Sequence, residues 1–306
     1  MRDFKTYPYS KGYSLHLSDG NNWWITSDDE NLWILEKFAD IMQLKESQSN
    51  GLPNLVFFSS KNKDKKSKSN TLHTGNNFSE SENGWESFNI NVSRIWYCSN
   101  DPDIVCEVRD NLGDTHEYLI MWNSIKAIYL RSFRMKGFPF HAGLAEYKGR
   151  GILLSADAGK GKSTYCRRLP EHWKPLCDDE TLVVMDKNRG YVAHPFPTWS
   201  EYLMKRSENK WDVQYSVPLS AIFFLEKSEK DEATPISVGQ SSIFITNSIV
   251  HVLNTLCSSM TYDERLKFIR DIFNSAYELA TVIPVFRLCV SLNGRFWEEI
   301  EKVLDL

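Results

Sequence analysis

The sequence predicts a mixed fold, α/β in its second half and α+β overall. Short apolar stretches of strand length alternate with segments of helical periodicity along the 306 residues. A polar stretch, residues 59–85, interrupts this alternation with five lysines between Lys61 and Lys68, and it favours a surface loop over a docking patch. A glycine-rich loop follows later, between an apolar strand and a helix. We therefore expect two parts, a smaller α+β region over residues 1–135 and a second domain over residues 136–306.

Composition and charge exclude several classes of protein. The chain is 42% hydrophobic and 25% charged, which is typical of a globular protein. A net charge of -4 gives no general attraction to nucleic acid or to anionic membranes, and no apolar run has the length of a membrane span or signal peptide. The six cysteines are scattered without metal-ligand spacing, as expected of free thiols in a reducing compartment. We expect a cytoplasmic protein that binds neither nucleic acid nor membrane.

The N-terminal region alternates strands with one helix. Residues 15–17 and 23–25 predict two short strands joined by a turn, and residues 55–58 predict a third. Between them, residues 30–42 place their apolar side chains on one helical face. Strand-like sequence resumes at residue 95 and continues to about residue 118.

A helix and a hairpin lead into the second domain. Residues 121–135 predict the helix, with Met121, Ile125, Ile128 and Phe133 facing inward. Residues 140–147 and 151–155 flank a Lys148-Gly149 turn, which predicts a β-hairpin.

The remaining elements are typical of an α/β domain. Expected strands are residues 181–185, 219–225 and 285–290. Thr261 and Glu264 predict a capping box at the start of a long helix. Its expected apolar stripe consists of Leu266, Ile269, Phe273, Ala276 and Ala280. A final helix is expected to face inward through Phe296, Ile300 and Val303.

The glycine-rich loop has nearly the full pattern of a phosphate-binding loop, which is Gly, four residues, Gly, Lys, and Ser or Thr. Ala156 stands in the first position, and Gly161, Lys162 and Ser163 complete the pattern. Glycines accept positive φ and let N–H groups approach phosphate oxygens, and a helix start adds further unpaired N–H groups. The lysine can neutralise the β and γ phosphates, and the serine hydroxyl can ligate Mg²⁺. The expected nucleotide contacts are Ala158, Gly159, Lys160, Gly161, Lys162, Ser163 and Thr164; the alternative is a basic turn that binds nothing.

Two carboxylates and a histidine accompany the loop. Phosphoryl transfer also needs a metal anchor and a group that orients the attacking hydroxyl. Asp178 and Asp179 precede the strand at 181–185, where carboxylates can hold Mg²⁺ and accept a proton, or can form a solvated acidic turn. His141 lies at the start of the hairpin, and a lone histidine is more often structural than catalytic.

These residues together resemble HPr kinase/phosphorylase and its related kinases. The resemblance rests on His141-Ala142-Gly143, the hairpin, the loop through Ser163 and Asp178-Asp179, and it covers about residues 138–304. It implies the phosphate-loop fold shared with phosphoenolpyruvate carboxykinase, with ATP phosphates bound by Lys162 and the loop amides. It further implies that Ser163 and one of the aspartates hold Mg²⁺, that the other aspartate is the base toward a serine hydroxyl, and that His141 lies beside the active site.

The chain also departs from that family. Ala156 replaces the first loop glycine, Ala158 replaces the family's serine, and no stretch matches the C-terminal signature used for phosphorolysis. The chain is more similar to divergent kinase-like proteins of peptide-modifying gene clusters, including the SynChlorMet cassettes and some lasso-peptide systems. The resemblance implies a kinase for a Ser or Thr of a peptide or small protein in the maturation of a peptide natural product. The alternatives are a nucleotide-binding scaffold without transfer activity and a small-metabolite kinase, and no base-contacting residue stands out.

Overall fold

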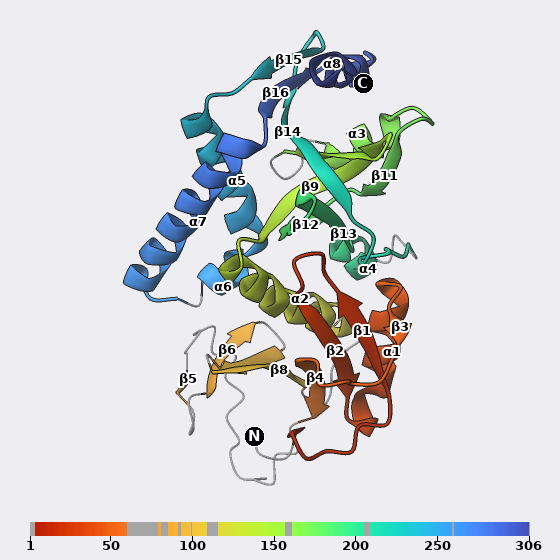
Figure 1. Ribbon diagram of the computed structural model, residues 1–306, viewed down its shortest axis with the longest axis vertical. Coiled ribbons are helices and arrows are strands. Elements are labelled where there is room, and N and C mark those ends of the chain that lie inside the picture. Colours follow the sequence, from red (N-terminus) through yellow and green to blue (C-terminus); the bar gives the residue numbers. More distant parts are fainter. Residues whose placement is uncertain are drawn as a thin grey trace.

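The computed structural model describes residues 4–59, 79–80, 85–90, 93–98, 100–108, 116–156, 161–204, 209–258 and 260–305. These residues form two mixed sheets, and the long helix α2 (His116–Arg134) lies between them (Figure 1). The architecture is therefore α+β with two mixed sheets, which confirms the predicted fold class in outline. Most of the expected polar loop, residues 59–85, lies outside the described residues.

The first sheet has eight strands within the described ranges, in the order β3-β1-β2-β4-β8-β7-β6-β5. Their bounds are β1 (Gly12–His16), β2 (Asn22–Ser27), β3 (Lys45–Glu46), β4 (Asn54–Ser59), β5 (Ser79–Glu80), β6 (Trp85–Ile90), β7 (Ser93–Cys98) and β8 (Asp101–Val108). β4 runs parallel to both β2 and β8, and the other neighbours are antiparallel. A parallel pair needs a crossover, and the short helix η2 (Asp29–Asn31) and α1 (Leu32–Ile41) supply the one between β2 and β4.

The second sheet carries the candidate site. Its order is β10-β9-β12-β13-β14-β16-β15, with β11 on β9 and an additional pairing of β10 with β14. The bounds are β9 (Phe138–Tyr147), β10 (Arg150–Ser155), β11 (Lys174–Cys177), β12 (Glu180–Asp186), β13 (Gly190–Phe196), β14 (Val217–Lys227), β15 (Glu232–Pro235) and β16 (Val285–Val290). β10, β14 and β16 are adjacent and parallel, so their carboxyl ends meet at one edge of the sheet.

The predicted hairpin is confirmed as β9 and β10. Lys148 and Gly149 connect the strands with φ values of 50° and 76°. Positive φ at both central residues is the requirement of the tight turn that matches the twist of a hairpin, and glycine meets it without strain. This turn fixes the register that places Ala142 opposite Ser155, at the end of the sheet where the candidate site lies.

The helices of the second half cover both sides of this sheet. They are α3 (Lys162–Arg168), α4 (Trp199–Leu203), α5 (Val238–Val252), α6 (Asn254–Cys257), α7 (Tyr262–Val282) and α8 (Phe296–Leu304). In Figure 1, α5 and α7 lie together on one side of the sheet and α3 lies on the other. Two separate apolar clusters reflect these sides, one with Ile245 and Ile249 of α5 and the other with Tyr165 of α3 and Phe296 of α8.

The long helix α7 confirms one sequence prediction and corrects another. Thr261 and Glu264 form the expected capping box. The predicted stripe is right only in part: Ala276 is fully buried as expected, but the other fully buried residues are Ile272 and Leu279, whereas Leu266 and Phe273 are 50% and 37% exposed. The helix meets its main partner, α5, along a face rotated by about one residue from the predicted stripe. An apolar pattern on its own does not show where a single neighbouring helix will contact it.

The two sheets share one core, and a buried histidine joins them. The larger apolar cluster is continuous from Leu15 and Ile25 in the first sheet to Leu182 in the second. His194 of β13 accepts a hydrogen bond at Nε2 from the backbone N–H of Ser18 (3.2 Å) and contacts the Val213 carbonyl through Nδ1 (2.9 Å). Burial lowers the pKa of His194 to about 4 and keeps the ring neutral.

The predicted boundary between residues 135 and 136 falls in the connection from α2 to β9, and the division into domains stays a prediction. Within the described ranges, every helix is too short or too polar to cross a bilayer.

Candidate functional site

The site begins where β10 passes into α3. β10 ends at Ser155, and α3 begins at Lys162. Of the predicted nucleotide contacts, Ala158, Gly159 and Lys160 lie outside the described residues. Gly161 has a φ of 95°, which confirms the expected left-handed conformation, and a Cβ atom there would meet nothing closer than 3.5 Å. Glycine is required at this position by backbone conformation and not by lack of space.

Lys162 is a buried cation at the centre of the site. Its side chain is 7% exposed, although lysine is almost never fully buried without partners. Nζ lies 2.5 Å from Nε2 of His141, 3.9 Å from Oδ1 of Asp179 and 3.4 Å from the carbonyl oxygen of Ala156. The side chain thus points toward the end of β10.

His141 and Asp179 come together because β9 and β12 pair side by side. His141 stands opposite Glu180 in the antiparallel register, and Asp179 directly precedes Glu180 in the chain. Nε2 of His141 lies 3.2 Å from Oδ1 of Asp179. Burial opposes the ionisation of Asp179, but the hydrogen bond from His141 and the charge of Lys162 outweigh it and hold its pKa below the usual value. Asp179 is therefore an ionised carboxylate at neutral pH.

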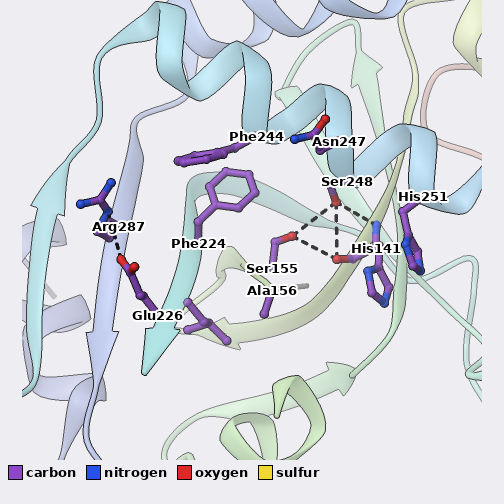
Figure 2. Close-up of a pocket in the computed structure, with 11 residues that line it drawn as sticks. His141, Ser155, Ala156, Phe224, Glu226, Phe244, Asn247, Ser248, His251 and Arg287 are labelled. Atoms are coloured by element: carbon purple, nitrogen blue, oxygen red, sulfur yellow. Dashed lines mark hydrogen bonds and ion pairs between the residues drawn. The ribbon is translucent and has the colours of Figure 1, made fainter. Parts of the chain in front are cut away.

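Contacts from α5 and β10 hold His141 in place. The backbone N–H of His141 donates to Oγ of Ser248 (3.1 Å), and Oγ of Ser155 donates to the carbonyl oxygen of His141 (3.1 Å) (Figure 2). The imidazole ring stacks on that of His251, with centroids 3.9 Å apart and planes 14° apart. These contacts set the position of the ring that faces Lys162 and Asp179.

The two predicted aspartates are not equivalent. Asp179 faces Lys162, whereas Oδ1 of Asp178 accepts a hydrogen bond from Oγ1 of Thr198 (2.5 Å). Thr198 is buried at the N-terminus of α4, so this bond ties the end of β11 to the connection after β13. Asp179 is therefore the one of the pair that lies beside the buried lysine.

A large cavity adjoins the cluster formed by Lys162, His141 and Asp179. Its volume is about 1010 Å³, and we call it the polar cavity. Of the predicted site residues, it is lined by His141, Gly161, Lys162, Ser163, Thr164 and Asp179. Helix α2 adds Trp122 and Lys126, which the sequence analysis did not select. Their place here follows from the tertiary packing of α2 against elements such as β9 and from its hydrogen bonds to Glu180, and no local motif signals it.

Glu180 connects α2 to the site. It is buried, and its carboxylate accepts hydrogen bonds from Nε1 of Trp122 (2.8 Å) and from the hydroxyl of Tyr129 (3.0 Å). Burial, followed by the charge of Asp179, raises the pKa of Glu180 to about 7, although Lys126 opposes this shift. Two neighbouring carboxylates thus have pKa values moved in opposite directions, a pattern common at functional sites.

The available oxygen donors fit the predicted metal. Magnesium takes hard oxygen ligands and is ordinarily held by one or two carboxylates together with substrate phosphates and water. Ser163 and Asp179 line the polar cavity, Asp178 directly precedes Asp179 in the chain, and all three carry oxygen donors of this kind. No cluster of three or more His, Cys, Asp or Glu able to bind a metal alone occurs among the described residues. The side chains therefore fit a metal that arrives with phosphate oxygens.

Fold and site together define a class: an α+β protein of two mixed sheets, in which a buried lysine at a helix start meets a histidine and an aspartate from paired strands. The family model described as SynChlorMet cassette protein ScmC matches residues 104–305. This is well over half of the chain, and the chain belongs to that family. The predicted link to the SynChlorMet cassettes is confirmed, and the relationship to HPr kinase stays a prediction. Among curated proteins, none matches the chain.

The matched segment begins within β8 and includes α2 and the whole second sheet. Every predicted site residue lies in it, as do Trp122, Lys126 and Glu180.

Proposed function

We propose that the protein transfers the γ-phosphoryl group of ATP to a Ser or Thr hydroxyl of a peptide or small protein. The supporting observation is the cluster of Lys162, His141 and Asp179 at the end of β10, in a cavity large enough for a nucleotide and an acceptor. Phosphoryl transfer depends mainly on positioning and on stabilising charge, and this cluster offers a cation and a carboxylate within 3.9 Å of each other. The proposed fold is the phosphate-loop type of HPr kinase, and the proposed location is the cytoplasm.

Each residue has a defined part in this proposal. The Lys162 ammonium neutralises the β and γ phosphates, which replace His141 and Asp179 as its nearest partners. Asp179 orients the acceptor hydroxyl and receives its proton as the bond to phosphorus forms. A lowered pKa makes Asp179 a weak base, which is adequate because the transition state of phosphoryl transfer is loose and the hydroxyl proton leaves late. Ser163 and Asp178 would hold Mg²⁺, which supplies further neutralisation of phosphate charge when bound.

Nucleotide binding is the first test. Lys162→Ala should abolish binding of MgATP in calorimetric titration, because it removes the buried ammonium proposed to neutralise the β and γ phosphates. Lys302→Ala is the matched control, since Lys302 lies on α8 and is 73% exposed. Equal affinities for wild type and Lys162→Ala would contradict the proposal.

Turnover distinguishes the proposed reaction from its alternatives. A short peptide encoded beside the protein should stimulate ATP consumption and should carry phosphate on a Ser or Thr in a mass spectrum. ATP binding with no turnover under any such peptide would instead define a scaffold. Stimulation by a free sugar or amino acid would define a small-metabolite kinase.

A further inference from the structure

A second, smaller cavity lies beside the first. Its volume is about 440 Å³, and it opens between the strands β14 and β16 and the helix α5 (Figure 2). We call it the aromatic cavity, because Phe224 of β14 and Phe244 of α5 line it with ring centroids 5.2 Å apart and planes 47° apart. Both rings are only half-buried, so part of their surface faces the cavity.

The aromatic cavity is continuous with the candidate site. It shares His141, Asn247 and His251 with the polar cavity, and it also reaches Ser155 and Ala156 at the entrance of the loop. Its floor is formed by the carboxyl ends of adjacent parallel strands, which is where ligands of open α/β sheets are bound. A molecule with its phosphates at Lys162 can therefore extend into either cavity.

The in-line geometry of phosphoryl transfer assigns the acceptor to one cavity and the nucleotide to the other. The attacking oxygen and the leaving oxygen lie roughly in line on opposite sides of the transferred phosphorus. Asp179, which would orient the attacking hydroxyl, lines the polar cavity and is absent from the lining of the aromatic one. The acceptor thus approaches from the polar cavity, and the leaving nucleoside diphosphate extends the opposite way, past His141.

The lining also fits a purine ring. A base has apolar faces that stack on aromatic rings and a polar edge that needs both donors and acceptors. Phe224 and Phe244 supply the rings, and the Asn247 amide supplies a donor and an acceptor. Arg287 and Glu226 stand at the rim as an ion pair (3.3 Å) with side chains 44% and 56% exposed, so both remain accessible to a ligand.

We propose that the aromatic cavity, with Phe224 and Phe244 as its stacking surface, is the subsite that takes the purine ring of the nucleotide whose phosphates lie at Lys162. This assignment rests on the proposed function. It gives the protein a means to select a nucleoside triphosphate over other polyphosphates.

The test compares a ligand that has a base with one that lacks it. Binding of MgADP and of magnesium tripolyphosphate is measured by calorimetry for wild type, Phe244→Ala and Phe244→Leu. The leucine variant keeps apolar packing but removes the aromatic face, so it serves if the alanine variant fails to fold. Phe268→Ala is the matched control, because Phe268 of α7 is also half-buried, packs against Phe133 of α2 and lines neither cavity.

The Phe244 variants should bind MgADP about tenfold more weakly, while their affinity for tripolyphosphate stays within about twofold of wild type. An equal loss for both ligands would overturn the subsite, because Phe244 would then act only by supporting the loop. Unchanged affinity for both, or wild-type binding of tripolyphosphate as tight as that of MgADP, would also overturn it. If Lys162→Ala still abolishes binding in those cases, the proposed function survives; if wild type binds neither ligand, both proposals fail.

Discussion

The polar cavity and the aromatic cavity meet at His141 but are built from different side chains. Charged groups from α2, α3 and β12 converge in the polar cavity. Phe224 and Phe244 dominate the wall of the aromatic cavity, and its one charged pair is exposed at the rim. Charges are costly to bury without partners, so a buried lysine and two carboxylates indicate a site kept for a polar ligand. The comparison separates groups that would act on phosphate from groups that would select the molecule carrying it.

Asp179→Asn should give the largest difference between an effect on turnover, assigned to the polar cavity, and an effect on nucleotide affinity, assigned to the aromatic cavity. The asparagine keeps the size of the side chain but cannot accept the hydroxyl proton, so turnover of ATP should fall by about a hundredfold or more. Affinity for MgADP should change little, because the contacts in the aromatic cavity and the Lys162 ammonium remain. Radiolabelled γ-phosphate release and calorimetry measure the two effects.

Asp263→Asn, on the exposed first turn of α7, is the control for that variant and should match wild type in both assays. A loss of affinity as large as the loss of turnover would show that Asp179 acts in binding and not in transfer.

The next largest expected effect is that of Glu180→Gln on the pH dependence of the free energy of unfolding. The folded-state pKa of Glu180 is about 7, above its ordinary value of 4.5, so its contribution to stability falls as pH rises from 4.5 to 7. The pKa of His194 is about 4, below its ordinary 6.5, so its contribution rises as pH increases from 4 to 6.5. Each effect is on the order of 3 kcal/mol, and they oppose one another where the ranges overlap.

Without the glutamate, the titration of His194 should act on stability unopposed. The free energy of unfolding of Glu180→Gln, from urea titrations at several pH values, should rise more steeply than that of wild type between pH 4.5 and 6.5. Glu299→Gln, on α8, should run parallel to wild type. Parallel curves for Glu180→Gln and wild type would contradict the raised pKa.

Ser248→Ala should have the smallest effect, since it removes a contact to His141, which lines both cavities, without removing a charge. Oγ of Ser248 accepts the backbone N–H of His141, and an unpaired buried N–H costs about 1–3 kcal/mol. Urea denaturation should show a loss of that order. Ser242→Ala is the control, because Ser242 bonds only the Val238 carbonyl within α5 and should cost less; equal losses would show that the bond to His141 has no special value.

Local chemistry made part of the fold predictable. The Lys148-Gly149 turn and the Thr261 capping box depend on residues a few positions apart, and both were predicted correctly. The buried face of α7 depends on α5, and the predicted stripe was right at Ala276 but wrong at Leu266 and Phe273 for that reason.

The candidate site likewise contains residues that a local pattern predicts and residues that only tertiary contacts bring in. Lys162 and Gly161 were found because a loop pattern signals them. Trp122 and Lys126 were missed because α2 reaches β12 only through the tertiary fold. The sequence also left Asp178 and Asp179 equivalent, since the bond from Thr198 that distinguishes them joins residues twenty positions apart.

The parallel pairing of β14 with β16 places Phe224 opposite Arg287. A chain emerging from the ribosome can bring His141, Lys162 and Asp179 together well before residue 287 has been synthesised, and long-range parallel pairing is intrinsically slow to form. The stacking pair Phe224 and Phe244 therefore precedes the rim residue Arg287 in order of synthesis, and the edge of the aromatic cavity is the last part of it to be completed.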